Sequence, residues 1–326
     1  MELTRLHTGS INYCSGFAES RTGGRSENQD CYGYAVTPRG FLITVCDGMG
    51  GGPGGKTASN IAVNEIIAGV LGANDDEETS NVIIKAVRRA NLAILENGNS
   101  NPELTGMGST TTVLLISEKS AFVAHVGDSR IYQIRGKKKI FRTFDHSMVF
   151  DLVKQKVITE EQARLSVQSN IITRALGITP DVQVDISELS YEKGDRFVLC
   201  SDGIHGMVSE KQLLKMLSNH KVALGAVTDD IATYIDNLGH TEGGGHDNMT
   251  LAIIETNICS KLKPNMTKQA KFTITVLAIL LTLSLGVNIM QYKNRVNNLS
   301  DVNHIDSTSV KVQKTDTIKI GNKEKL

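Results

Sequence analysis

The sequence lacks several features that would point to particular classes of protein. Its five cysteines are widely spaced and form no Cys-x-x-Cys pair, so neither a zinc clamp nor a dithiol redox site is indicated. The 35 basic and 35 acidic residues cancel, which gives no sign of a nucleic-acid partner. The first residues contain no apolar core of a secretory signal. Free cysteines fit a reducing cytoplasmic compartment, with Cys46 and Cys200 expected as small buried side chains.

Long uncharged runs are also scarce, and the clearest one lies at residues 272–290. Its 19 residues would span roughly 28 Å as a helix, close to the thickness of a bilayer core. We therefore expect a single transmembrane helix in the cell membrane. Four lysines precede the run, whereas Lys293 and Arg295 follow it. The positive-inside rule then predicts that the large N-terminal part faces the cytoplasm.

The remaining sequence divides into a large domain and short flanking segments. We predict a domain over 1–258, a basic juxtamembrane linker over 259–271 and a polar tail over 291–326. Apolar periodicity predicts helices at 57–71 and 80–96, the second ending at Asn97-Gly98, and a helical stretch with breaks at 145–177. Strands are expected at 40–46, 110–116, 120–126, 130–135, 196–200 and 249–255. This mixture favours a layered α/β or α+β domain over a helical bundle.

Four aspartates beside glycine or asparagine lie at the ends of apolar, strand-like runs. They occur in Asp47-Gly48, Gly127-Asp128, Asp202-Gly203 and Asp247-Asn248. Strand ends bring distant carboxylates to one rim of a sheet, where they repel each other unless cations lie between them. The sequence shows no cluster of histidine and cysteine that zinc would prefer, so a hard cation such as Mg²⁺ or Mn²⁺ is indicated.

A glycine-rich segment supports a rival hypothesis. Residues 50–57 read Gly-Gly-Gly-Pro-Gly-Gly-Lys-Thr and match the P-loop pattern of nucleotide hydrolases. Pro53, however, removes a backbone N–H from a loop that should present N–H groups to phosphate. The P-loop hypothesis also leaves Asp128, Asp247 and the segment around Arg25 without a role. A nucleotide hydrolase remains the alternative to a metal site built from the aspartates.

Seven short polar motifs occur in a defined order along residues 13–255. They are Arg25-Ser-Glu-Asn-Gln-Asp30, Asp47-Gly-Met-Gly-Gly51, Gly108-Ser-Thr-Thr111, Gly127-Asp-Ser-Arg130, Asp145-His-Ser147, Ser201-Asp-Gly203 and Asp247-Asn248. This ordered set resembles the bacterial PP2C-type (PPM) metal-dependent serine/threonine protein phosphatases, and residues 145–177 are similar to the flap of that family. The resemblance implies an α+β fold: a two-sheet antiparallel β-sandwich flanked by helices in four αββα layers, here followed by the transmembrane helix.

The resemblance also implies roles for individual residues around two Mn²⁺ or Mg²⁺ ions. Asp47 would bridge the ions, with the Gly48 carbonyl on one of them and Asp202 and Asp247 on the other. Asp30 would contact the centre through water, and Asp128 would hold a third, weaker ion together with Asp202. Arg25 would grip the substrate phosphate, a task suited to a guanidinium. Water lying between the ions would attack phosphoserine or phosphothreonine directly, without a phosphoenzyme.

Two positions depart from other members of the family. Met49 stands where animal members have a histidine proposed as general acid, and methionine cannot donate a proton. Gln29 stands where some relatives have glutamate, which changes the charge near the metals. The lone Asp145-His146 pair is interpreted as structural, and Gly108 to Thr111 as the start of a strand.

The resemblance implies partners as well. We expect phosphorylated proteins as substrates, a Ser/Thr kinase among them, and no nucleic acid. A catalytically silent regulatory module on the same fold is a further alternative, which the presence of all the metal ligands disfavours.

Overall fold

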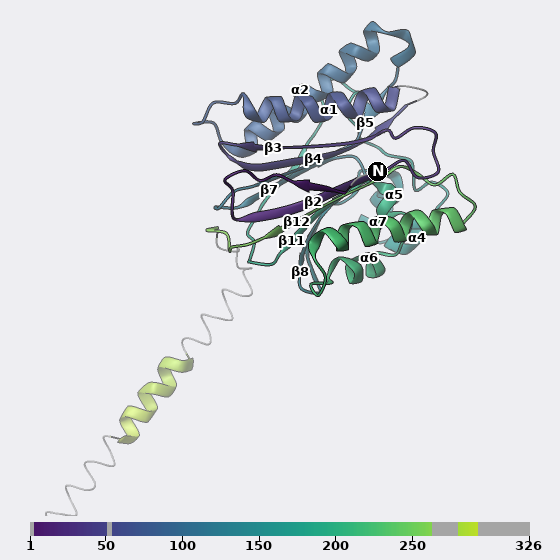
Figure 1. Ribbon diagram of the computed structural model, residues 1–326. Coiled ribbons are helices and arrows are strands. Elements are labelled where there is room, and N and C mark those ends of the chain that lie inside the picture. Colours follow the sequence, from purple (N-terminus) through teal and green to yellow (C-terminus); the bar gives the residue numbers. More distant parts are fainter. Residues whose placement is uncertain (1–2, 51–53, 263–279, 293–326) are drawn as a thin grey trace, which may run out of the picture. The chain divides into compact units, whose positions relative to one another are not determined.

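The computed structural model describes residues 3–50, 54–262 and 280–292. The chain divides into two units, Met1–Pro264 and Asn265–Leu326. The first unit contains two antiparallel sheets and the helices that cover them (Figure 1). The second is treated separately below.

The first sheet has six strands in the order β1-β2-β12-β11-β8-β9. These strands are β1 (Thr4–Leu6), β2 (Cys14–Arg21), β12 (Met249–Thr256), β11 (Arg196–Cys200), β8 (Arg130–Arg135) and β9 (Lys138–Arg142). Every neighbouring pair is antiparallel. Strands far apart in the sequence, such as β2 and β12, are therefore adjacent in space.

The second sheet has the order β10-β7-β6-β4-β3, and a short strand, β5, pairs with the C-terminal end of β4. Its strands are β10 (Asp185–Leu189), β7 (Ala121–Val126), β6 (Thr111–Ile116), β4 (Gly40–Met49), β3 (Asp30–Thr37) and β5 (Gly108–Ser109). All these pairs are antiparallel as well.

Helices cover the outer face of each sheet (Figure 1). Helices α1 (Gly54–Leu71) and α2 (Thr79–Ser100) lie on the second sheet, and a 3-10 turn, η1 (Pro102–Leu104), follows α2. Helices α5 (Asp202–His205), α6 (Glu210–Leu217) and α7 (Leu224–Thr241) pack against the first sheet. The order of layers is therefore helix, sheet, sheet, helix, which confirms the predicted αββα architecture.

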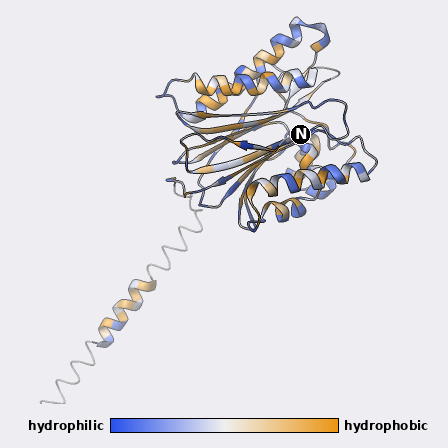
Figure 2. Ribbon diagram, in the orientation of Figure 1, coloured by the Kyte–Doolittle hydropathy of each residue, from blue (hydrophilic) through white to orange (hydrophobic). Residues whose placement is uncertain are grey.

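Alternation along the central strands explains why so many are apolar on both faces. In β4, Leu42 and Cys46 contact the core beneath α1 and α2, whereas Ile43 and Val45 point into the core between the sheets. In β11, Val198 faces the helices of its own side. Successive residues of a strand point to opposite faces, so a strand covered on both sides reads as a continuous apolar run. The orange strands in Figure 2 show this pattern.

The predicted flap differs from its expected helical form. Only α3 (Met148–Lys154) and α4 (Glu160–Arg164) are helical within residues 145–177, and Thr159 with Gln162 forms the predicted capping box. The rest is irregular chain fixed by bridges of Ser147 to Ile172 and of Ser109 to Leu176. The prediction of a mostly helical segment was wrong because few apolar side chains there are buried, so little packing favours longer helices.

The end of α2 was also predicted incorrectly. The helix continues through Asn97-Gly98 to Ser100, because Asn97 Nδ2 and Ser100 Oγ donate to the carbonyls of Ala93 and Glu96. At the domain boundary, β12 ends at Thr256, but backbone hydrogen bonds from residues 260–262 still hold the chain to the domain. The predicted boundary at 258 stays a prediction.

The C-terminal unit contains part of the predicted membrane span. Residues 272–279 of that span lie outside the described residues, as does the tail from 293 onward. Residues 280–292 are helical, and their apolar side chains are exposed. Within the described ranges, no helix is both long and apolar enough to cross a membrane.

Candidate metal centre

Asp30 and Asp47 are brought together by the pairing of β3 and β4. Their Cα atoms are register partners at the end of the two strands. Two hydrogen bonds to Thr110, which lies just before β6, fix the backbone of Asp47. The Asp47 N–H donates to Thr110 Oγ1 at 3.0 Å, and the Asp47 carbonyl accepts from the Thr110 N–H at 2.8 Å. The Asp47 carboxylate is therefore attached to a backbone that these hydrogen bonds hold in place.

Gly48 is required by the same packing. A Cβ at this position would lie 2.0 Å from the Gly55 carbonyl oxygen and 2.7 Å from that of Gln29. Any side chain would push β4 away from the start of α1 and from the loop before β3. The glycine keeps three backbone segments in contact beside Asp47.

Asp202 lies where β11 passes into the short helix α5, and its neighbour Ser201 joins the two sheets. The Ser201 hydroxyl donates to Asp30 Oδ2 at 2.7 Å and accepts from the Thr250 N–H at 2.9 Å. Gly203 packs against the next strand, because a Cβ there would be 2.0 Å from the Asn248 carbonyl oxygen. The Ser201 hydroxyl thereby connects Asp30, on the second sheet, to the residue that precedes Asp202.

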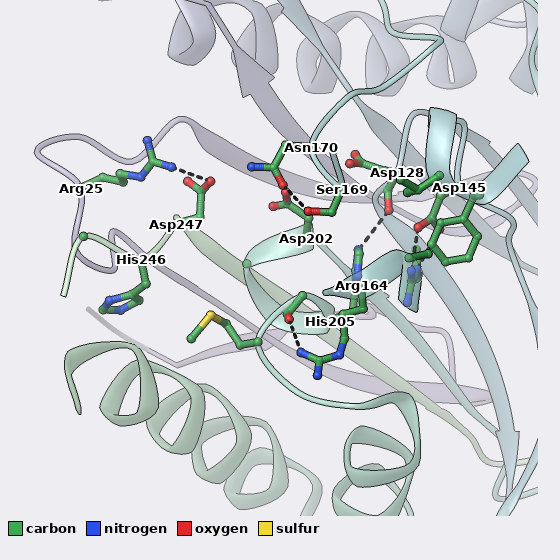
Figure 3. A pocket seen from close by; sticks show the side chains of 18 residues that line it. Arg25, Asp128, Asp145, Arg164, Ser169, Asn170, Asp202, His205, His246 and Asp247 are labelled. Carbon is green, nitrogen blue, oxygen red and sulfur yellow. Dashed lines mark hydrogen bonds and ion pairs between the residues drawn. The ribbon is translucent and has the colours of Figure 1, made fainter. Parts of the chain in front are cut away.

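Asp247 is positioned by Asn248. The Asn248 amide accepts from the Gln29 N–H at 2.8 Å and donates to the carbonyls of Thr22 and Glu27 at 2.7 and 2.9 Å. It thus ties the start of β12 to the loop before β3. Asp247 Oδ2 then accepts from Arg25 Nη2 at 2.9 Å (Figure 3).

Asp128 is held at the end of β7 through two histidines. Its carbonyl contacts His205 Nε2 at 3.0 Å, and the preceding Gly127, with φ 104°, donates its N–H to His146 Nδ1 at 3.1 Å. Asp145 pairs with Arg130 through two hydrogen bonds of 2.8 and 2.7 Å. Asp145 and His146 therefore support the backbone around Asp128, in agreement with their structural interpretation.

The carboxylates share a strongly repulsive environment. Burial raises the pKa of Asp47 and of Asp128 well above the ordinary range, and repulsion from neighbouring aspartates adds to both. Burial and repulsion from Asp202 and Asp247 raise the pKa of Asp30 to about 7. Burial and repulsion from Asp247 raise that of Asp202 to about 6, although hydrogen bonds to Asp47 and to the Gly203 N–H act in the opposite direction.

These residues fit a pair of hard divalent cations. The Oδ1 atoms of Asp30 and Asp202 are buried and accept no hydrogen bond from any described residue. Such atoms are costly unless a cation contacts them directly or through water. Carboxylate and carbonyl oxygens are the ligands that Mg²⁺ and Mn²⁺ prefer.

A cavity of about 300 Å³ opens beside this centre. Asp128, Asp202, Asp247 and Arg25 all line it, together with flap residues that include Arg164, Ser169 and Asn170 (Figure 3). Arg164 Nη1 donates to the Gly206 carbonyl at 3.0 Å, which attaches the flap to the turn after α5. Asp30 and Asp47 do not line this cavity.

Some functional residues were missed by sequence reasoning. Ser201 and Asn248 lay inside recognised motifs but received no role, because their partners Asp30 and Gln29 come from distant strands. Arg164 and Asn170 gave no signal beyond their place in the flap. The fold also brings together His125, His146 and Asp185, and elsewhere Asp236, His240 and His246, which the sequence analysis did not connect.

The glycine loop gives no support to the nucleotide hydrolase hypothesis. Residues 51–53 lie outside the described residues. Lys56, which that hypothesis needs for phosphate, pairs instead with Glu27 at 3.1 Å on the surface.

The profile of the family "Protein phosphatase 2C" matches residues 19–241. This chain belongs to the protein phosphatase 2C family. It is 33% identical over 239 residues to the protein phosphatase PhpP of Streptococcus pneumoniae, covering 72% of this chain and 93% of the relative. The crystal structure of the serine/threonine phosphatase Stp1 from Staphylococcus aureus aligns with a TM-score of 0.69 and 28% identity, over 78% of this chain and 99% of that chain.

A further solved structure of the family bears on the metals. The catalytic domain of the phosphatase PstP in complex with two manganese ions aligns with a TM-score of 0.62 and 29% identity, over 75% of this chain and 99% of that chain. Membership of the protein phosphatase 2C family makes this chain a metal-dependent protein serine/threonine phosphatase. The same membership confirms the predicted family.

Proposed function

We propose that this phosphatase removes phosphate from serine or threonine side chains of other proteins by direct attack of water at the Asp47, Asp202 and Asp247 centre. The observation that supports this most is the group of buried aspartates with raised pKa values next to a cavity that also contains Arg25. The substrates are therefore phosphorylated proteins, and a Ser/Thr kinase among them stays a prediction.

Two Mg²⁺ or Mn²⁺ ions, when bound, would supply an activated water at neutral pH and offset the negative charge of the phosphoryl group. Asp47, the Gly48 carbonyl, Asp202 and Asp247 are the groups that would hold them. Ser201 holds Oδ2 of Asp30, and Oδ1, which accepts no hydrogen bond from the described residues, would orient water at the centre. Asp128 is buried next to Asp202, and the two carboxylates would share a third ion.

Arg25 is placed to bind the substrate phosphate. Its side chain is 53% exposed and bonds to Asp247 with one nitrogen, which leaves the remaining guanidinium donors available at the cavity. A cation held by Asp247 would weaken the attraction of that carboxylate for Arg25. The guanidinium would then be able to bind a phosphate dianion with two parallel hydrogen bonds.

The proton for the leaving alkoxide comes from neither Met49 nor His205. Methionine has no proton to donate. Burial lowers the pKa of His205 far below its usual value, and its ring already bonds to the Asp128 carbonyl, so it is neutral when the enzyme works. Water at the centre is the remaining donor that we propose.

Replacing Arg25 with alanine is expected to lower kcat/KM for a phosphothreonine peptide with Mn²⁺ by about 10- to 100-fold, because hydrogen bonds to charged groups are each worth about 1.5–3 kcal/mol. The fold should persist, since Arg25 lies at the surface. The control is Lys56→Ala, which breaks an exposed ion pair and should change the rate less than about twofold. A large loss in Lys56→Ala with a normal Arg25→Ala would instead support the nucleotide hydrolase alternative.

We further propose that residues 272–290 anchor the enzyme in the cell membrane with the catalytic domain in the cytoplasm. The support is the absence of charge over this run, the lysines that precede it and the apolar residues at 280–290 (Figure 2), whose side chains are exposed. After cell lysis, the full chain should sediment with membranes and resist extraction by alkaline carbonate, whereas a chain ending at residue 262 should stay in the supernatant. Recovery of the full chain in the supernatant would contradict the anchor.

A further inference from the structure

A second group of metal-ligating side chains lies at the C-terminal end of α7. Asp236 and His240 are one helical turn apart, and His246 reaches them from the loop that follows the helix. His246 Nε2 lies 2.9 Å from Asp236 Oδ1, and His240 Nε2 lies 3.5 Å from the same oxygen. All three ligand atoms are within 4.8 Å of one another.

The charge around this cluster favours a cation. Arg21 contacts Asp236 Oδ2 at 3.4 Å, but the same guanidinium also pairs with Glu19 and Asp229. Three carboxylates therefore surround one arginine. Glu19 Oε2 is buried and accepts no hydrogen bond from the described residues.

Only one ring nitrogen of His246, Nε2, has a polar contact among the described residues. Its side chain is 4% exposed, and its buried Nδ1 has no hydrogen-bond partner among the described residues. The ring packs against Gly239 so closely that a Cβ there would lie 2.2 Å from Cγ of the imidazole. The helix thus has a glycine where the ring needs space, and the ring presents Nε2 to Asp236.

The other histidine cluster differs in a decisive respect. Between His146 and Asp185 lies Arg174, whose Nη1 is 3.0 Å from His146 Nε2 and 2.8 Å from Asp185 Oδ1. There the guanidinium contacts both the ring nitrogen that would bind a metal and the carboxylate. At the end of α7, Arg21 contacts Asp236 through Oδ2, whereas Oδ1 is the oxygen nearest the two histidine nitrogens.

We propose that Asp236, His240 and His246 bind a zinc ion, separate from the catalytic centre. Two imidazole nitrogens and one carboxylate oxygen are ligands that zinc binds at about 2.0–2.2 Å, with water in the fourth position. The two histidine nitrogens lie 2.9 and 3.5 Å from Asp236 Oδ1, and all three atoms are within 4.8 Å of one another, so side-chain rotation would bring them onto one ion. The catalytic centre, built from oxygen ligands, prefers harder cations.

Zinc at this position would fix the loop that carries Asp247. Gly243, Gly244 and Gly245 all have positive φ, between 71° and 110°, so the loop between α7 and His246 has little intrinsic stiffness. His246 directly precedes Asp247 in the chain. Binding His240 and His246 to one ion therefore ties that loop to the end of the helix.

The test uses the full chain with the catalytic centre saturated by excess Mg²⁺. Zn²⁺ titrated calorimetrically should bind at one additional site per chain, and Co²⁺ in its place should give the intense visible absorption of a tetrahedral site with nitrogen ligands. His240→Ala removes an exposed ligand without disturbing the core, and it should weaken Zn²⁺ binding at least about tenfold and abolish the Co²⁺ band.

The matched control is His220→Ala, since His220 is a partly exposed histidine that also faces one carboxylate, Glu255. It should leave both signals unchanged. Asp202→Asn should leave them unchanged too, because Asp202 belongs to the other centre. Absence of a Zn²⁺ site in the presence of Mg²⁺, equal loss in His220→Ala, or persistence of the Co²⁺ band in His240→Ala would each overturn the proposal.

Discussion

Asp47→Asn is expected to reduce hydrolysis of a phosphothreonine peptide by about 10²- to 10⁴-fold, because a metal pair contributes several kcal/mol to the transition state. Asp47 is repelled by four neighbouring aspartates, namely Asp30, Asp202, Asp128 and Asp247. The same substitution should raise the melting temperature of the metal-free chain, since an amide of equal size removes that repulsion. Loss of activity with a gain of stability distinguishes a functional group from a structural one.

Both effects can be measured on the same preparations. Rates are compared at saturating Mn²⁺, and melting is followed by calorimetry in EDTA. Asp181→Asn is the control, since the Asp181 side chain is 93% exposed and should change neither quantity. An Asp47→Asn enzyme that keeps a normal rate, or that is less stable than the parent without metal, would contradict the assigned role.

The metal-free chain should become more stable as the pH falls from 8 to about 5. Asp202 has an ordinary pKa of 3.8 when unfolded and about 6 in the folded chain, and Asp30 rises to about 7. The folded state therefore binds more protons between these values, so its stability declines as the pH rises through them. For Asp202 alone the difference corresponds to about 3 kcal/mol.

Bound Mn²⁺ should reverse this dependence, because the cation competes with protons for the same oxygens. Chemical denaturation at several pH values, with EDTA and with saturating Mn²⁺, measures both slopes. We expect stability in EDTA to fall between pH 5 and 7, and stability in Mn²⁺ to rise over the same interval. Parallel curves under the two conditions would show that the aspartates are not the metal ligands.

The sequence predicted the central strands because their burial on both faces makes them continuous apolar runs. Strands β4, β6, β7, β8, β11 and β12 all lie within a few residues of their expected positions. Strands β1, β3, β9 and β10 were not predicted, and neither was β2, although it lies inside the first sheet. Polar or exposed residues interrupt the apolar pattern in these strands; β9 begins with three exposed residues, Lys138, Lys139 and Ile140. These strands depend on pairing with neighbours more than on their own residues.

Helix α7 was also not predicted, although Val227, Ile231 and Ile235 recur at helical spacing and are buried against the first sheet. That omission concealed the zinc cluster, because Asp236 and His240 lie on its last turns. The aspartates of the catalytic centre could be found from sequence, since each follows or precedes a recognisable strand. The links made by Ser201 and Asn248 could not, because they depend on the register between strands far apart in the chain.

The location of bound manganese tests the central claim most directly. Crystals of the enzyme grown with Mn²⁺, measured at the manganese absorption edge, should show two anomalous peaks about 3.5–4 Å apart. We predict that the Asp47 carboxylate lies between these peaks and that Asp202 and Asp247 contact one of them. Peaks that avoid Asp47, or a single peak with no contact to Asp202 or Asp247, would contradict the proposed centre.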